Sequence, residues 1–245
     1  MKRKVMNKVH KKKLPKNNFT GILVCDKPRD WTSHDVVAKL RSYFKLKKIG
    51  HAGTLDPIAT GVLVLLCGKA TKLSDKLIAD EKEYRFDILF GTTTDSQDIT
   101  GKIIKQEESP SERSAEEVEK VLQEFRGEIS QLPPMFSAVK INGKRLYKLG
   151  REGKTVEREP RKIFIKELVL ENIKWPRATL RAVCSKGTYI RTLCNDIGEK
   201  LCEGGGCMES LVRLRSGEFT IEQAKKLDEI LSLSLEEFED KLIKV

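Results

Sequence analysis

One carboxylate in this 245-residue chain stands in a setting that suits catalysis. The stretch Ile49–Thr60 is rich in Gly, Thr and Pro, which predicts an irregular loop ahead of an apolar, buried strand. Asp56 in this loop precedes Pro57, so extended geometry is favoured over helix at that position. A carboxylate that a cation holds in a dry pocket can act as a nucleophile or a general base. Asp is also a common turn or cap residue, and the residues alone leave both interpretations open.

The sequence patterns of several other chemistries are missing. Gly68–Thr71 (GKAT) resembles the end of a Walker phosphate loop, but Leu63 stands where that loop needs its first glycine. No GxGxxG, HExxH, GxSxG or CxxC pattern occurs, so a dinucleotide site, a zinc site and a disulfide framework are disfavoured. The longest purely apolar run, Val62–Cys67, has six residues, which excludes a membrane-spanning helix. We therefore expect a cytoplasmic protein with reduced thiols.

The positive charge of the chain is unevenly distributed. Lys and Arg number 47 against 36 Asp and Glu, a net charge of +11. Residues 1–18 hold eight bases and no acid, which predicts a disordered basic arm suited to phosphates. Residues 140–162 hold nine bases and three acids with Tyr147 among them, a pattern that suits looped or single-stranded nucleic acid. An acidic substrate or a nucleic acid is therefore the expected partner, with a membrane surface as second choice.

Two other classes of function compete with a carboxylate enzyme. A non-catalytic RNA-binding protein has no need of Asp56, because a carboxylate repels phosphates. A metal-dependent nucleic-acid hydrolase requires several clustered acids. Asp95 and Asp98 are close in sequence, but the polar stretch Thr92–Asp98 is read more simply as a turn.

The elements that must position Asp56 are strands and helices in irregular alternation. Strands are expected at Gly21–Cys25, Val62–Cys67, Tyr84–Phe90, Ile163–Glu171, Ala178–Cys184 and Leu211–Phe219. Helices are expected from Thr32 or Ser33 to Phe44, at Ala70–Ala79, from the capping box at Ser114 to Phe125, at Thr188–Leu201, and after the capping box at Thr220. Because no regular βαβ rhythm is visible, the fold class is α+β with a mixed sheet.

Five segments together resemble one enzyme family. Gly50–Gly61 (GHAGTLDPIATG) is similar to the catalytic signature of the TruB family of pseudouridine synthases, which isomerise uridine 55 in the T-loop of tRNA. The other matching segments follow in the family's order: Leu23–Pro28, Lys82–Arg85, Cys184–Thr192 and Leu211–Arg215. One such motif would be suggestive, but five in order over about residues 19–219 are very specific.

The resemblance implies a fold and a domain organisation. It implies a catalytic domain at 19–219 with the pseudouridine synthase fold, a mixed, largely antiparallel sheet flanked by helices. Residues 133–160 resemble the RNA-binding thumb inserted in the bacterial stand-alone branch, so no guide RNA is expected. Most bacterial members continue into a PUA-type domain. Here residues 220–245 predict only a short, acidic, helical tail with no PUA domain.

The resemblance also assigns roles to residues. Asp56 would be the nucleophile, at the sugar or at the base, and Arg191 would pair with it. Tyr84 would pack on the flipped base and relay the C5 proton, and His51 would stack where the uridine has left the RNA. Lys27 would support the first-motif loop or reach RNA. Tyr189 and Leu214 would line the pocket, and Lys144, Arg145 and Lys148 would contact phosphates.

The implied reaction exchanges a C–N for a C–C glycosidic bond within one nucleotide. It needs no cofactor and no metal. The expected partner is the T-stem-loop of tRNA and not a membrane, and the expected oligomeric state is a monomer.

Overall fold

The computed structural model describes residues 17–137, 139–141, 143–154 and 156–245, and for residues 140–141, 144–145, 147–148 and 151 it describes the backbone alone. Apart from Asn17 and Asn18, the basic arm expected at residues 1–18 lies outside the described residues.

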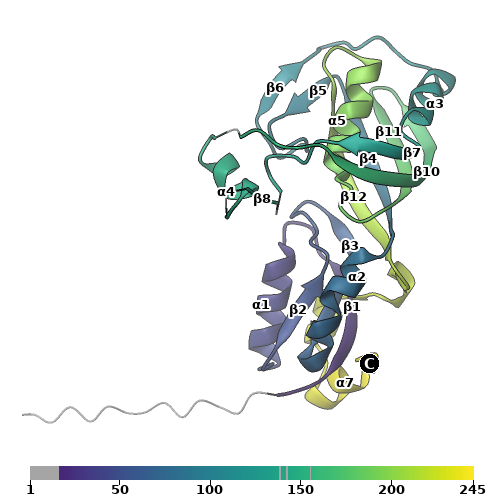
Figure 1. Cartoon of the computed structure of the whole chain (residues 1–245). Helices are drawn as coiled ribbons and strands as arrows, with labels where there is room; N and C mark the ends of the chain where they lie inside the picture. Colours follow the sequence, from purple (N-terminus) through teal and green to yellow (C-terminus); the bar gives the residue numbers. More distant parts are fainter. Residues whose placement is uncertain (1–16, 138, 142, 155) are drawn as a thin grey trace, which may run out of the picture.

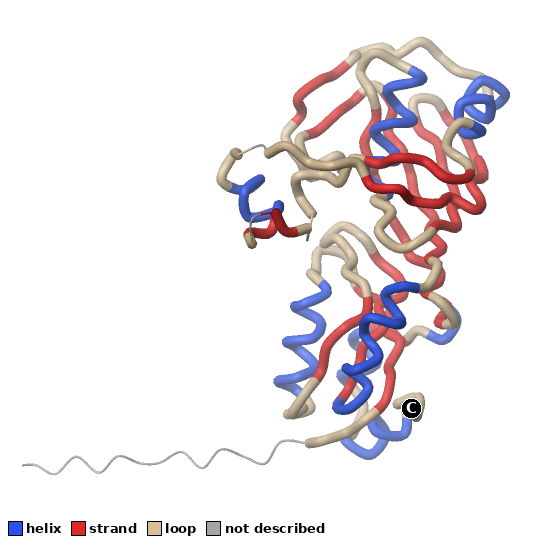
Figure 2. The backbone as a smooth tube through the Cα atoms, in the orientation of Figure 1, coloured by secondary structure: helices blue, strands red, loops and turns tan. Residues whose placement is uncertain are grey.

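Within the described residues ten strands form one sheet, which runs through both halves of the molecule (Figures 1 and 2). Its main path is β14-β1-β3-β12-β4-β11-β10-β7, with β2 beside β3 and β13 beside β12. The strands are β1 (Gly21–Lys27), β2 (Ile49–Ala52), β3 (Thr60–Cys67), β4 (Lys82–Phe90), β7 (Gly127–Gln131), β10 (Arg161–Lys174), β11 (Arg177–Cys184), β12 (Gly206–Ser216), β13 (Phe219–Thr220) and β14 (Lys225–Lys226). Only the β1–β14 and β3–β12 pairs within the described sheet are parallel. The predicted α+β class with a mixed, largely antiparallel sheet is confirmed.

The lower half of Figure 1 is a layered lobe around β1 and β3. Residues of β3 alternate between two apolar clusters: Leu63 and Leu65 enter one, and Val62 and Val64 enter the other. Helix α1 (Ser33–Tyr43) supplies the first cluster, while the 3-10 turn η1 (Gly68–Leu73) and α2 (Ser74–Ala79) supply the second. The continuous apolar run in the sequence is therefore a strand that is buried on both faces.

The upper half carries the rest of the sheet and the helices α3 (Ala115–Gln123) and α5 (Ile190–Leu201). Helix α5 packs on β12 and β4, and α3 packs on β10. Apolar side chains from both helices, including Val118, Leu122 and Leu193, enter the same cluster as the sheet residues Phe86 and Leu180. Each half of the sheet thus presents an apolar face to a helix, as layered α+β folds require.

Two small hairpins stand apart from the main sheet. One pairs β5 (Thr92–Thr94) with β6 (Ile103–Gln106), and the other pairs β8 (Lys140–Ile141) with β9 (Lys144–Arg145). The β8–β9 hairpin is followed by α4 (Leu146–Arg151), and this segment projects from the sheet at the level where the two halves meet (Figure 1).

Four sequence expectations about local structure need correction. The helix expected to open at the Thr220 capping box is instead a 3-10 turn at Ile221–Gln223 followed by strand β14, and α-helix begins only at Leu227. The segment Ile49–Ala52, expected to be loop, is strand β2 and pairs with β3, so His51 lies on a strand. The prediction depended on the Gly, Thr and Pro content of Ile49–Thr60, most of which follows Ala52. The expected helix Ala70–Ala79 is a 3-10 turn followed by a short α-helix. Thr92–Thr94, also expected to be loop, forms β5.

The C-terminal residues fold back onto the lower lobe. After the 3-10 turn η2 (Ile221–Gln223), β14 pairs with β1, and α6 (Leu227–Leu231) and α7 (Leu235–Asp240) follow. Phe238 of α7 is buried and stacks on Phe44, with ring centroids 4.1 Å apart. Ile243 exchanges two backbone hydrogen bonds with Ile22 of β1. In the described residues no helix has the length and apolar character needed to cross a membrane.

Candidate active site

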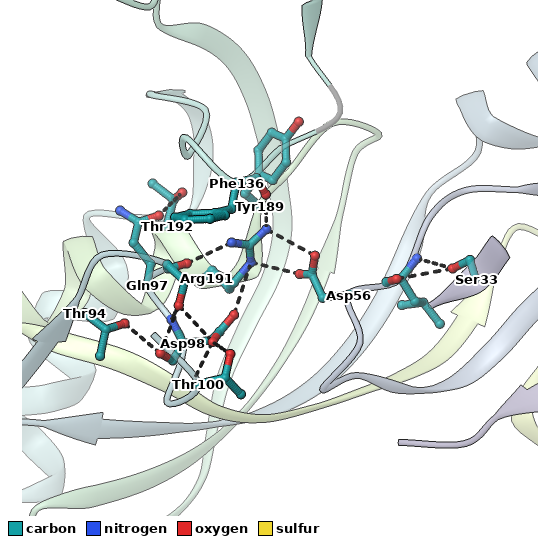
Figure 3. A network of polar contacts seen from close by, with 12 residues as sticks. Ser33, Asp56, Thr94, Gln97, Asp98, Thr100, Phe136, Tyr189, Arg191 and Thr192 are labelled. Carbon is teal, nitrogen blue, oxygen red and sulfur yellow. Dashed lines mark hydrogen bonds and ion pairs between the residues drawn. The ribbon is translucent and has the colours of Figure 1, made fainter. Parts of the chain in front are cut away.

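Asp56 lies in the connection between β2 and β3, where the two halves of the sheet meet. Leu55 is buried, and Ser33 at the start of α1 holds its backbone, accepting from Leu55 N–H at 2.9 Å and donating to Leu55 C=O at 3.2 Å (Figure 3). Ile58 and Ala59 are buried after Asp56. The loop is therefore fixed on both sides of Asp56, while the Asp56 side chain itself remains 32% exposed.

Arg191, in the first turn of α5, forms a bidentate ion pair with Asp56. Its Nε donates to Asp56 Oδ2 at 2.9 Å and its Nη2 donates to Asp56 Oδ1 at 3.1 Å. The guanidinium is also held by Ser96 C=O, 2.8 Å from Nη1, and by Phe136 C=O, 2.7 Å from Nη2. Because the Arg191 side chain is only 4% exposed, the fork has one orientation and imposes it on the carboxylate. The contact expected between Asp56 and Arg191 is present.

A second carboxylate, Asp98, lies on the other side of Arg191. Its Oδ2 is 3.9 Å from Arg191 Nε, and its Oδ1 accepts from Ser96 Oγ at 2.9 Å and Thr100 Oγ1 at 2.6 Å. Figure 3 shows Arg191 between the two carboxylates. From its place in the polar stretch Thr92–Asp98, Asp98 was expected to be a turn residue. It does close a turn, but it is buried and faces the guanidinium. Nothing in its sequence neighbourhood distinguishes it from a surface aspartate.

Two tyrosines flank this network. Tyr84, on β4, is half-buried, and burial raises the pKa of its phenol, with the Arg213 guanidinium opposing that rise. Tyr189 is the residue that precedes α5, and the Gln131 side chain clamps its backbone. Gln131 Oε1 accepts from Tyr189 N–H at 2.8 Å, and Gln131 Nε2 donates to Tyr189 C=O at 3.1 Å. The Tyr189 ring lies beside Arg191 in Figure 3, and its place in a substrate pocket stays a prediction.

Lys27 is wholly buried next to the loop that carries Asp56. Its Nζ donates to the carbonyl oxygens of Pro28 at 2.8 Å, Trp31 at 2.6 Å and Pro57 at 3.1 Å. Burial lowers the pKa of Lys27 to about 8. Since three carbonyl groups take its three protons, the side chain ties the turn after β1 to the loop of Asp56. This is the loop-supporting role of the two roles that the resemblance offered.

Two of the remaining predicted residues are half-buried on strands, and three are described by their backbone alone. His51 is half-buried on β2, and burial together with the Arg213 charge lowers the pKa of its imidazole. Leu214 falls at a register shift of β12 against β4 and is half-buried. Lys144 and Arg145 belong to β9 and Lys148 to α4, and their side chains are outside the described part of the structure. Their phosphate contacts stay a prediction.

No group of three or more His, Cys, Asp or Glu among the described residues could hold a metal ion. The chemistry that the site offers is that of a partly exposed carboxylate with a fixed orientation, bordered by tyrosines.

Comparisons with known proteins bear on this arrangement. The model "TruB family pseudouridylate synthase (N terminal domain)" matches residues 41–190, and "tRNA pseudouridylate synthase B C-terminal domain" matches residues 191–245. A tRNA pseudouridine synthase B of Francisella tularensis is 46% identical over 221 residues, which cover 90% of this chain and 72% of that protein. The protein of the same name from Opitutus terrae is 44% identical over 234 residues, which cover 94% of this chain and 95% of that protein.

Solved structures give the same result for the fold. A Cbf5–Nop10–Gar1 complex has a chain that matches with a TM-score of 0.71 and 28% identity, over 92% of this chain and 60% of that chain. An H/ACA ribonucleoprotein bound to a substrate RNA that contains 2′-deoxyuridine matches with a TM-score of 0.68 and 26% identity, over 92% of this chain and 59% of that chain. With two family models that divide residues 41–245 between them and relatives near 45% identity, this chain belongs to the TruB family of pseudouridylate synthases.

Proposed function

We propose that this pseudouridine synthase acts on uridine 55 in the T-loop of tRNA and that Asp56 is its nucleophile. The observation that carries the proposal is the two-point contact between a buried arginine and a partly exposed aspartate, Arg191 and Asp56. The curated relatives that match most of the chain are named tRNA pseudouridine synthase B, which supports tRNA as the substrate.

The reaction moves the bond between ribose and uracil from N1 to C5. If Asp56 attacks C1′, an ester forms at C1′ and the N1–C1′ bond breaks, with its electron pair leaving on uracil. After the uracil turns, C5 attacks C1′ and releases the carboxylate. If Asp56 adds to C6 instead, the same two glycosidic bonds break and form while the carboxylate stays on the base, and the C6–O bond then breaks to release the carboxylate. A glycal route, in which the carboxylate acts as a base, is the third possibility. Each route ends with loss of the C5 proton, so product formation releases one hydrogen from C5.

Asp56 can reach a uridine only after the base leaves its stack, because C1′ and C5 are covered while the base is stacked. Flipping costs a few kcal/mol, and contact with aromatic rings returns roughly 1–3 kcal/mol per base. Tyr84 and Tyr189 are the aromatic residues that we place against the flipped uracil. His51, with its pKa lowered, is neutral near pH 7 and suits stacking in the RNA in place of the lost base.

The proposed partner is the T-stem-loop of tRNA, bound without a guide RNA by a cytoplasmic monomer. Residues 133–160 are the proposed RNA-binding thumb. Their position supports this role, because Phe136 C=O holds Arg191 and the backbone of α4 comes close to the Phe136 ring at Gly150.

Tritium release from a T-stem-loop with C5-labelled uridine tests the proposal. We expect tritium release and one pseudouridine at position 55. The control is the same RNA with cytidine at position 55 and its other uridines labelled, from which no tritium should be released. Release from the control, or a product at another position, would contradict the assignment of uridine 55.

A further inference from the structure

Arg213 is a buried cation that the proposed chemistry does not use. Its side chain is only 1% exposed. On β12 it has Gly61 of β3 as its neighbour on one side and Tyr84 of β4 on the other. It therefore sits where the parallel β3–β12 pair joins the two halves of the sheet.

The guanidinium of Arg213 holds both ends of the catalytic loop. Its Nε donates to Val62 C=O at 2.7 Å, on the strand after the loop. Its Nη2 donates to Gly53 C=O at 3.1 Å, on the segment before Asp56. Gly53 has a φ of +90°, and a Cβ there would lie 3.3 Å from Arg213 Nη1. The loop backbone therefore closes tightly around this guanidinium.

No carboxylate of the described residues forms an ion pair with Arg213, whereas Arg191 contacts two. A buried guanidinium without an anion is costly, so a role that is only structural would be served better by an apolar side chain. The Arg213 charge acts instead on polar groups of the site. Through its charge and a side-chain hydrogen-bonding contact with the phenol, Arg213 opposes the burial-induced rise in the pKa of Tyr84, and its charge adds to the lowering of the pKa of His51.

We propose that Arg213 is a positioning residue for the isomerisation: it fixes the Gly53 end of the catalytic loop and the Tyr84 hydroxyl in one frame, so that Asp56 and Tyr84 meet the same nucleotide. The inference rests on the proposed function of Asp56 and Tyr84. In this proposal β12 provides no reacting group, and its role is to align the Asp56 loop with the neighbouring strand β4.

The test compares Arg213→Lys and Arg213→Met with Lys82→Met. Lys82 is also a buried cation bonded to carbonyl groups, but its partners are Leu77, Ile78 and Asp80 at the end of α2. The readouts are melting temperature, RNA affinity by filter binding, and the single-turnover rate constant at saturating T-stem-loop.

Arg213→Lys keeps the charge but loses the fork, so we expect the rate constant to fall at least about tenfold while RNA affinity changes less than about threefold. In a Tyr84→Phe background the same change should cost less than about threefold, because the hydroxyl that it aligns is gone. Lys82→Met should lower the melting temperature without changing the rate constant. A folded Arg213→Lys variant with the wild-type rate constant, or equal losses with and without the Tyr84 hydroxyl, would overturn the proposal.

A measurement on the free protein separates this inference from the proposed function. The phenol pKa of Tyr84 is taken from the difference between spectrophotometric titrations of each protein and its Tyr84→Phe version. Arg213→Met should raise that pKa, whatever RNA the enzyme modifies. One outcome is that the wild type releases no tritium from any T-loop while Arg213→Met still raises the Tyr84 pKa. In that case the proposed function fails and the contact between Arg213 and Tyr84 stands. An unchanged pKa would refute the contact between Arg213 and Tyr84.

Discussion

At the residue scale the site is built around one guanidinium. Arg191 and Asp56 are 135 positions apart in sequence and meet through two hydrogen bonds. Asp98 stands behind the guanidinium, and the carbonyl groups of Ser96 and Phe136 accept from Nη1 and Nη2. The side chain can satisfy these groups together only because it is a planar fork.

Arg191→Lys should therefore remove most of the activity. An ammonium cannot hold two carboxylate oxygens and two carbonyl groups in one plane, so we expect a single-turnover rate constant lower by at least about a hundredfold. Filter binding should show RNA affinity within a few-fold of wild type, since the guanidinium faces the carboxylates. A lysine variant within a few-fold of the wild-type rate would show that Arg191 is peripheral.

The sequence identified Asp56 and Arg191 through the resemblance, but it missed Asp98 and Arg213. Both missed residues are charged side chains that a pattern analysis assigns to the surface, because burial of a charge leaves no mark in the sequence. Their partners are also distant: Arg213 contacts Gly53, 160 positions away. Such contacts follow from strand order, which periodicity does not determine.

At the element scale the predicted strands and helices were mostly confirmed, and the errors concern short elements. β2 and β5 were missed because Gly50 interrupts one and a run of threonines forms the other. Helix α2 is short, and a side chain from the following strand stabilises its C-terminal end. Lys82, buried at the start of β4, donates to three carbonyl groups at the end of this helix.

The stability difference between wild type and Lys82→Met should depend on pH. Burial lowers the pKa of Lys82 to about 8 from 10.5. Between these values the unfolded chain binds a proton that the folded protein does not, so this lysine increases stability as pH rises, at most about 1.4 kcal/mol per pH unit. The free energy of unfolding of the wild type should rise relative to that of Lys82→Met from about pH 8 to 10.5. Below pH 7 the difference between the two free energies should be constant.

Urea titrations of both proteins at several pH values measure this difference. Lys76→Met, which removes an exposed lysine of the same helix, controls for the loss of a surface charge. A difference between wild type and Lys82→Met that stays constant across the window would mean that Lys82 titrates alike in both states.

At the scale of the whole molecule, the C-terminal residues belong to the lower lobe. Phe238 stacks on Phe44, and Leu242 is buried beside them. The apolar spacing of Leu227, Ile230 and Leu231 predicted a helix in residues 220–245, and α6 and α7 are present. Their attachment to β1 could not be predicted, because one phenylalanine among acidic residues indicates no partner.

Phe238→Ala should destabilise the protein by about 3–5 kcal/mol, because it leaves a cavity between α7 and α1. The matched control is Leu235→Ala on the same helix, whose side chain is exposed and whose loss should cost less than about 1 kcal/mol. Chemical denaturation gives both free energies of unfolding. Equal, small losses would show that α7 is not part of the lobe's core.

RNA affinity should depend on the projecting segment around α4. Replacing Lys144, Arg145 and Lys148 by Ala should weaken binding of the T-stem-loop and reduce the log–log salt slope by roughly 0.7–0.9 for each lost phosphate contact.

Deleting residues 1–16 should flatten the salt slope for full-length tRNA but barely change turnover at saturating RNA. Filter binding across a salt series tests both. An unaltered slope for the triple variant would place the RNA elsewhere.

The central claim, that Asp56 is the nucleophile, is tested most directly by Asp56→Asn. The amide keeps the shape of the side chain and its contacts but cannot form the covalent bond or take a proton. Tritium release from the C5-labelled T-stem-loop should fall below detection, while filter binding stays within a few-fold of wild type. Measurable turnover by a preparation that mass spectrometry shows to be free of deamidated protein would contradict the account.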